Sequence, residues 1–273
     1  PGAALMLREV NMFRFSSRLP RCLVYAALGL AIGAPLLPAQ AGVIISGTRQ
    51  VYPEQRREIT VRVTNDDKHA PRLVQAWLDA GDASVTAEQS DVPFSLTPPV
   101  FRVDPGKSQA MRLAYTREPL PKDKESVFWL NVLEVPPLVS PPPGAAQDEE
   151  DNLNHLRFAF RIRTKVFFRP QSLPGKPEEA PAQLRWSVQG STLKVHNPSA
   201  YHVSFNEVAV ALGTHEGAKV IQTAQQGMVA PFTSLEFALT SALGAPPAQA
   251  RVQFKYIDDF GGFSAMQQAP LNP

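Results

Sequence analysis

The residues that could carry catalysis are few in this sequence and poorly spaced for it. Asp258 and Asp259 could form a carboxylate pair for acid–base chemistry, but the Phe-Gly-Gly that follows them favours a turn or an ion pair. None of the five histidines has metal-binding spacing, and His196 and His202 are expected to be surface or hydrogen-bonded structural residues. The Gly-Lys-Ser at 106–108 resembles the end of a phosphate-binding loop, but phenylalanine stands five residues earlier where glycine is required. We therefore predict no catalytic residue, no metal and no cofactor, although spacing alone leaves open a site assembled from distant residues.

Two cations stand within otherwise apolar segments and are the remaining candidates for recognition chemistry. Arg49 lies in the middle of GVIISGTRQVYP, and Lys165 opens the apolar run KVFF. A guanidinium offers a fork of hydrogen-bond donors, and an ammonium offers a point charge. Taken alone, however, each is expected to form a structural ion pair or to be a surface cation whose stem covers apolar groups.

The segment 156–170, LRFAFRIRTKVFFRP, is the strand expected to position Lys165. Its first half alternates with the period of a strand. Four apolar residues share one face of it: Leu156, Phe158, Phe160 and Ile162. Such a face is a hazard in water unless a partner covers it, whereas an ordinary sandwich strand would cover it with its own core. The pattern leaves both possibilities open.

The rest of the chain is typical of an all-β protein. It is rich in proline, with 27 in 273 residues, and short alternating segments are separated by turn residues. Strands are expected within 42–53 (one edge strand), 59–63, 73–78, 95–101, 111–115, 125–137, 156–170, 184–188, 192–195, 201–210, 235–239 and 250–256. This spacing favours two β-sandwiches over a parallel α/β sheet. The polar, proline-rich stretch 171–183 is the expected linker between an N-terminal domain, 42–170, and a C-terminal domain, 184–273.

Residues 1–41 have the features of a secretory signal. Basic residues precede an apolar stretch, and Ala39-Gln40-Ala41 offers small side chains at the two positions that signal peptidase reads. A membrane anchor is the alternative, but glycine and proline interrupt the apolar stretch, so cleavage after Ala41 is expected to leave no membrane insertion. Removal would take the net charge from +2 to −1 and would remove Cys22, the only cysteine, so the mature protein could form no disulfide. No basic stripe indicates nucleic-acid binding.

The stretch 120–137, LPKDKESVFWLNVLEVPP, resembles the signature of the periplasmic pilus-assembly chaperones of the chaperone–usher pathway. The pattern is long and specific, with a proline, Glu125-Ser126, an aromatic strand, Asn131 and a final proline pair. Further matching pieces follow in the family's order over nearly the whole mature chain: Gly47-Thr48-Arg49, Ala76-Trp77, Thr97-Pro98-Pro99-Val100, Pro105-Gly106, KVFFRP at 165–170, Asn197-Pro198 and YIDDFGG at 256–262.

The resemblance implies two immunoglobulin-like β-sandwich domains set at an angle, with a cleft between them. It implies a periplasmic chaperone that binds pilin or fimbrial subunits, blocks their premature polymerisation and delivers them to an outer-membrane usher. In this family the subunit is a sandwich that lacks one strand, and the chaperone lends it a strand. The donated-strand anchors would here be Leu156, Phe158, Phe160 and Ile162.

The resemblance also implies roles for charged residues. Arg49 and Lys165 match the two cations that hold the C-terminal carboxylate of the subunit. Glu125, Arg169 and Asp259 match the positions of an ion-pair network between the domains. That network would orient the domains and would not contact the subunit.

Four points stay open. The connection 138–155 is long for the short-loop subclass of these chaperones, yet the cysteine pair often expected in the long-loop subclass is absent. The second domain ends soon after Gly262, so its last strand is expected to be short or supplied differently. An exported β-sandwich subunit or adhesin of a surface fibre is the alternative function, because an unpaired strand would also serve polymerisation. The free chaperone could self-associate through the same strand.

Overall fold

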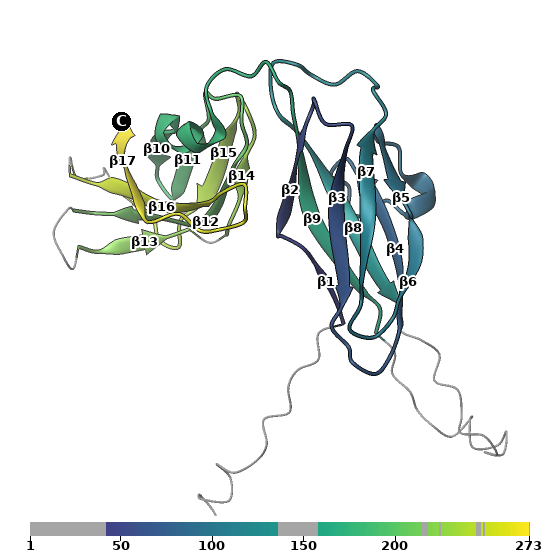
Figure 1. Cartoon of the computed structure of the whole chain (residues 1–273). Helices are drawn as coiled ribbons and strands as arrows, with labels where there is room; N and C mark the ends of the chain where they lie inside the picture. Colours follow the sequence, from purple (N-terminus) through teal and green to yellow (C-terminus); the bar gives the residue numbers. More distant parts are fainter. Residues whose placement is uncertain are drawn as a thin grey trace, which may run out of the picture. The chain divides into compact units, whose positions relative to one another are not determined.

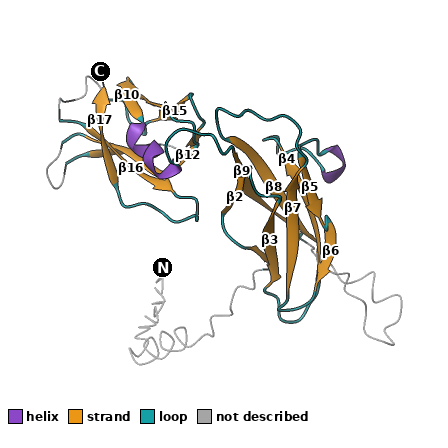
Figure 2. Cartoon of the chain, turned by 45° about the horizontal axis from the view of Figure 1, so that its top comes forward, coloured by secondary structure: helices purple, strands orange, loops and turns teal. Residues whose placement is uncertain are grey.

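The computed structural model describes residues 42–135, 158–213, 218–223, 225–243, 247 and 249–272. Within these ranges nearly all regular structure is β-strand, and the helical segments are short 3₁₀ turns (Figure 2). The expected leader, the connection 138–155 and Leu156 lie outside the described residues. No helix in the described part of the chain has the length and hydropathy needed to span a membrane.

The N-terminal half folds into two sheets that enclose one core (Figure 1). One sheet has the strand order β1-β3-β7-β5, and the other has the order β2-β9-β8-β4-β6. The strands and the 3₁₀ turn η1 are β1 (Val43–Ile45), β2 (Arg49–Pro53), β3 (Glu58–Asn65), β4 (Arg72–Asp79), η1 (Ala87–Gln89), β5 (Phe94–Thr97), β6 (Val100–Val103), β7 (Ser108–Tyr115), β8 (Ser126–Val135) and β9 (Phe160–Arg169). The pairing of β2 with β9 is parallel, and the other pairings of these strands are antiparallel.

Alternation along the strands decides which side chains fill this core. On β3, Val61 and Val63 are fully buried while their neighbours on the other face are exposed or half-buried. Met111 and Leu113 are likewise fully buried on β7, which pairs with β3. Each such side chain contributes roughly 1.5–3 kcal/mol when it leaves water. The packed core therefore gives β8 and β9 a rigid support without a disulfide.

The segment 42–53 is not the single edge strand that its composition suggested. β1 pairs with β3 in one sheet, whereas β2 pairs with β9 in the other. Gly47 lies in the link between them with a φ of 78°, a conformation that glycine adopts easily and that lets the chain change sheets. Alternation reports the faces of a strand and not its partners, so the sequence pattern did not reveal the switch. Its consequence is that Arg49 begins β2 directly beside Lys165.

The C-terminal strands surround a second core (Figure 1). Their path of pairing is β13-β12-β16-β17-β10-β11-β15, and β14 pairs with β12. The elements are η2 (Pro177–Gln183), β10 (Arg185–Gln189), β11 (Thr192–His196), β12 (Val203–Ala211), β13 (Val220–Gln222), β14 (Met228–Val229), β15 (Ser234–Ala238), β16 (Arg251–Ile257) and β17 (Gln267–Asn272). The aromatic side chains of Trp186, Phe205, Phe237 and Phe254 pack against one another at its centre.

The last strand was expected to be short or supplied differently, but the chain supplies a strand of ordinary length itself. β17 has six residues, pairs antiparallel with β16 and runs parallel to β10. Its sequence, QQAPLN, contains proline and few β-formers, so propensity gave no strand signal. Pairing with two neighbours stabilises it instead. The brief strands β13 and β14 were missed for the related reason that two or three residues hold no readable period.

The stretch 171–183 is more structured than its polar, proline-rich composition suggests. Its second half forms the 3₁₀ segment η2, in which Pro177 occupies the first turn. Ala180 and Pro181 are buried, and Ala180 belongs to the C-terminal core. The chain that enters the C-terminal domain is therefore fixed to that domain before β10 begins.

Candidate functional site

Strand β9 is paired differently along its two halves. β8 accompanies it from Phe160 to Phe168, whereas β2 pairs only with its second half, Lys165–Arg169. Among the described residues, the 160–164 half therefore has no strand on its second edge. Backbone N–H and C=O groups on such an edge can pair with a further strand.

The free edge coincides with an apolar face. Phe158 and Phe160 are each 60% exposed, and their ring centroids lie 6.2 Å apart. Ile162 is half-buried and packs against the N-terminal core. These three predicted anchors therefore share one face, while Leu156 lies outside the described residues. The side chains run from solvent into the core, so an added strand could extend that core outward.

The opposite face of β9 is fixed by polar contacts that the sequence analysis did not find. Arg163 Nε donates to Asp79 Oδ2 at 3.1 Å, and its guanidinium lies 4.3 Å from the centre of the Trp129 ring. Asn131 donates to the same carboxylate oxygen at 2.7 Å. Burial opposes ionisation of Asp79, but the hydrogen bonds from Arg163 and Asn131 outweigh it and lower the pKa of this carboxyl. The network joins β4, β8 and β9 in one register.

Arg49 and Lys165 lie opposite each other on β2 and β9. Arg49 is buried, its Nη1 donates to the carbonyl of Ile257 at 3.0 Å, and its guanidinium lies 5.7 Å from the centre of the Phe167 ring. Burial lowers the pKa of Arg49, although Asp259 and other nearby carboxylates oppose this. For Lys165, burial and then the charge of Arg49 lower the pKa from 10.5 to about 8. Lys165 is thus a destabilised cation in the free protein.

Most hydrogen-bond donors of this cation pair are unused within the described residues. Lys165 forms no hydrogen bond or ion pair there, and its Nζ lies 5.3 Å from the centre of the Trp129 ring. Arg49 uses one of its five N–H groups, and its Nε is buried without a partner. Two adjacent cations with spare donors favour an anionic ligand, because a carboxylate would satisfy both the charge and the hydrogen bonds.

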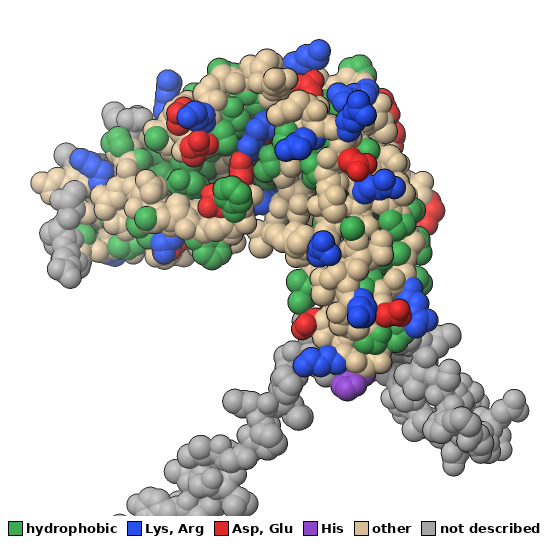
Figure 3. All heavy atoms as spheres, viewed as in Figure 1, with side chains coloured by type: hydrophobic (Ala, Val, Ile, Leu, Met, Phe, Trp, Pro, Cys, Tyr) green, Lys and Arg blue, Asp and Glu red, His purple; other side chains and the backbone are tan. Residues whose placement is uncertain are grey.

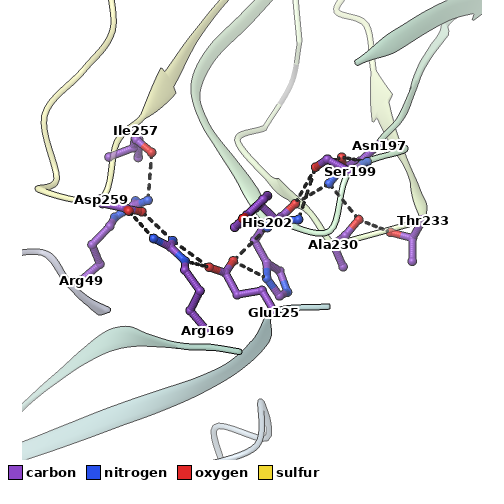
Figure 4. Close-up of polar contacts among 11 residues, drawn as sticks. Arg49, Glu125, Arg169, Asn197, Ser199, His202, Ala230, Thr233, Ile257 and Asp259 are labelled. Carbon is purple, nitrogen blue, oxygen red and sulfur yellow. Dashed lines mark hydrogen bonds and ion pairs between the residues drawn. The ribbon is translucent and has the colours of Figure 1, made fainter. Parts of the chain in front are cut away.

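Arg169 connects the two halves of the chain. Its Nε donates to Glu125 Oε1 at 2.8 Å, and its two terminal nitrogens donate to the Asp259 carboxylate at 2.6 and 3.0 Å (Figure 4). Burial alone would lower the pKa of Arg169, but the hydrogen bonds and charges of Asp259 and Glu125 raise it. The structure thus brings together three residues that are up to 134 positions apart in sequence, namely Glu125, Arg169 and Asp259.

Glu125 has a second set of partners around His202. Its Oε2 accepts a hydrogen bond from the His202 backbone at 3.0 Å and lies 3.0 Å from the His202 Nδ1 (Figure 4). The Glu125 backbone also donates to the Ala200 carbonyl at 2.9 Å. Both side chains are buried. His202 is therefore a hydrogen-bonded structural residue, and only the tertiary contact assigns it to the network.

These charged residues border a pocket of about 600 Å³ lined by both halves of the chain. Figure 3 shows acidic and basic side chains close together around a hollow on this face. Asp258 does not form a catalytic pair with Asp259, because its Oδ1 accepts hydrogen bonds from Phe260 and Gly262 and closes the turn. In the ranges that the structure describes, no cluster of His, Cys, Asp or Glu could hold a metal ion. The lining of the pocket includes Arg49 together with several carboxylates.

Two models of known protein families together match almost all of the chain from residue 42 onward. The model for the N-terminal domain of PapD, described as a pili and flagellar-assembly chaperone, matches residues 42–174. The model for the C-terminal domain of the pili-assembly chaperone PapD matches residues 179–268. The chain belongs to the PapD family of pilus-assembly chaperones. The resemblance seen in the 120–137 signature is therefore confirmed.

Similar proteins extend the match to PapD-family chaperones of several bacteria. The chaperone protein FimB/FhaD of Bordetella pertussis is 41% identical and aligns over 93% of this chain and 98% of its own length. The probable fimbrial chaperone YadV of Escherichia coli K12 is 41% identical over 81% of this chain and 87% of its own. The relatives of this chain are thus chaperones, and one of them is described as a probable fimbrial chaperone. The prediction that this protein is not an enzyme is confirmed by its family.

Solved structures confirm the fold class. The crystal structure of the YadV chaperone has a TM-score of 0.68 at 39% identity and covers 85% of this chain and 100% of its own. A chain from the complex of the Salmonella enterica SafA pilin with the SafB chaperone has a TM-score of 0.67 at 28% identity, with coverage of 86% and 99%. This PapD-family protein accordingly has two immunoglobulin-like β-sandwich domains. It is a chaperone of the fimbrial chaperone–usher pathway.

Proposed function

We propose that this PapD-family chaperone lends the segment 156–162, which leads into β9, to pilin or fimbrial subunits. The observation that carries the proposal is the free edge of β9 at 160–164, which coincides with the exposed rings of Phe158 and Phe160. A subunit that lacks a strand needs main-chain hydrogen bonds along its open edge and apolar side chains in its groove. β9 offers both in one segment. The chaperone–pilin complex known for a similar structure supports a pilin as the partner.

Arg49 and Lys165 are proposed to hold the C-terminal carboxylate of the subunit. Their adjacency, their lowered pKa values and their unused donors all favour an incoming anion. A carboxylate anchored there would fix the register in which the subunit's edge runs along β9. Arg49 lines the pocket, and we propose that the tail of the subunit reaches the pair from that side.

The remaining assignments concern export and the arrangement of the two domains. We propose that residues 1–41 are removed after Ala41 in the periplasm, that the domains span 42–170 and 184–273, and that 171–183 joins them. Glu125, Arg169 and Asp259 would fix the orientation of the domains, because each is already satisfied by the others. With the subunit folded on β9, the complex would pass to an outer-membrane usher.

Co-purification with a subunit tests the proposal. The tagged chaperone is expressed in a periplasm with candidate subunits encoded beside its gene, and recovery is compared for Arg49→Ala, Lys165→Ala and the exposed control Lys107→Ala. We expect each site variant to lower the affinity for the subunit about 10- to 100-fold, since each loses a charge-assisted hydrogen bond. The Lys107→Ala variant should bind as wild type does.

Two outcomes would contradict these assignments. Undiminished recovery by both folded site variants would reject the carboxylate site. Recovery of the chaperone only as long polymers of itself would favour the fibre-subunit alternative, whereas a self-associated dimer that dissociates when subunit is added is compatible with strand donation.

Binding of the carboxylate is expected to depend on pH through Lys165. Its pKa in the free protein is about 8, so a rising fraction becomes neutral above that pH. The affinity for a subunit peptide with a free C-terminus should fall by up to about tenfold per pH unit above pH 8. Isothermal titration from pH 7 to 10 measures this, with Lys165→Met and an amidated peptide as controls that should show little dependence. An identical pH profile for the amidated peptide would contradict the assignment.

The same shift predicts the sign of a stability effect. The folded pKa of Lys165 lies below the usual value of 10.5, so the unfolded chain binds more protons between about pH 8 and 10.5. The contribution of Lys165 to the stability of the free protein should therefore rise as the pH rises through this window.

A further inference from the structure

Near the end of β8, opposite Phe160 of β9, the buried carboxylate of Glu134 faces the first described residues at the start of β1. Its Oε2 accepts a hydrogen bond from the backbone nitrogen of Val43 at 2.9 Å. Its Oε1 lies 3.3 Å from Nη1 of Arg72, which also pairs with Asp67 at 2.6 Å. Two carboxylates thus share one guanidinium. The group as described carries one uncompensated negative charge in a largely buried place.

Gly42 lies directly against this carboxylate. A Cβ atom at position 42 would be 2.2 Å from both Oε1 and Oε2 of Glu134, which is far inside contact distance. The Gly42 carbonyl accepts a hydrogen bond from Asp66 N at 2.9 Å, so its backbone is held in place. The Gly42 nitrogen is bonded to the same Cα, and covalent geometry places it within about 5 Å of the carboxylate. An opposite charge at that distance would stabilise the ionised carboxylate.

The sequence predicts that the chain is cut at this residue. Hydrolysis of the Ala41–Gly42 peptide bond consumes one water, leaves a carboxylate on Ala41 and creates an ammonium group on Gly42. A peptide N–H has one donor and no charge, whereas the new α-ammonium has three donors and a positive charge near pH 7. The match of the family model also begins at residue 42.

We propose that Glu134 is the binding site for the α-ammonium group of Gly42 in the mature protein. The new positive charge balances the group of Glu134, Asp67 and Arg72 and fixes the start of β1 to the end of β8. Removal of the leader therefore stabilises the N-terminal sandwich, and the unprocessed chain lacks this contact. The inference rests on the proposed cleavage after Ala41.

The test begins with the N-terminal sequence of the protein purified from a periplasm, which should start at Gly42. Four chains are then released from a cleavable fusion: chains starting at Gly42 or at Ala41, each with and without Glu134→Gln. In the chains that keep Glu134, the extra Ala41 should destabilise the fold and raise the equilibrium constant for urea unfolding about tenfold. In the Glu134→Gln background the same extension should change it less than twofold. Glu58→Gln, at an exposed glutamate of β3, should leave the tenfold effect intact.

A second measurement needs no change at Glu134. Acetylation of the N-terminal amine by acetic anhydride, followed on the N-terminal peptide by mass spectrometry, should be at least about tenfold slower for the Gly42 chain than for the Ala41 chain, because only the amine of the Gly42 chain is paired. Equal rates, or equal effects of Ala41 in both backgrounds, would overturn the ammonium site and leave the chaperone function untouched. A mature start at another residue would overturn the proposed cleavage and this inference together, again without bearing on subunit binding.

Discussion

Replacing Arg169 with leucine is expected to lower the free energy of unfolding by about 3–5 kcal/mol. Glu125 is only 3% exposed and would lose its guanidinium partner while remaining buried. Asp259 would lose two hydrogen bonds at the same time. Leucine leaves the volume largely filled, so the loss reports an unpaired buried charge more than a cavity. Urea unfolding of the mature protein measures it.

The exposed pair Lys194–Glu236 provides the matched control. Both side chains are at least half exposed, and their charged atoms are 3.4 Å apart. Lys194→Leu should therefore change the free energy of unfolding by less than about 1 kcal/mol. If Arg169→Leu were no more harmful than Lys194→Leu, the network would not hold the two halves of the chain together. Replacing Glu125 by glutamine in the Arg169→Leu background should restore part of the loss, because it removes the orphaned charge.

Replacing Phe160 with aspartate is expected to abolish subunit capture while leaving the free chaperone folded. The ring is 60% exposed in the free protein, so its own core depends little on it. In a donated strand the same ring would be buried, at roughly 1.5–3 kcal/mol, and an unpaired carboxylate in its place would oppose binding further. The affinity for the subunit should fall at least about 100-fold. Co-purification and titration with a subunit measure the effect.

The control for this change is Phe232→Asp. Phe232 is 48% exposed and belongs to the C-terminal half, in the turn between β14 and β15. Its replacement should leave subunit binding within about twofold of wild type and, like Phe160→Asp, should not alter the unfolding midpoint strongly. Equal losses of binding in both variants would indicate a general surface effect and would contradict donation by β9.

Local sequence patterns determined the strands and their faces. The alternation in 156–170 predicted that Phe158 and Phe160 share a face and that the following KVFF run is buried, and the structure has this arrangement. The turn at 104–106 has an equally local cause, because proline presets φ and Gly106 takes a φ of 64°. These features depend on neighbours within a few residues, which is the range that a sequence pattern reports.

Motif resemblance, and not spacing, supplied the candidate site. Arg49 and Lys165 alone would be interpreted as surface cations, since nothing near them in sequence is a partner. Their proximity comes from the parallel pairing of β2 with β9, which in turn requires the chain to change sheets at Gly47. The spare donors and the lowered pKa of Lys165 are properties of that pairing.

The tertiary structure alone decided the contacts between distant segments. The free edge of β9, the contact of His202 with Glu125, the last strand β17 and the approach of Gly42 to Glu134 all involve separate parts of the chain. The alternation of side chains along a strand is set within a single segment. The strand that pairs with each edge, and the group that pairs with each buried charge, are set by how the sheets pack. The sequence by itself therefore determined most of the strand segments and the family to which the chain belongs, but not the short strands β13 and β14 or the last strand β17. Which edge is left open, and which charges are left uncompensated, followed only from the folded chain.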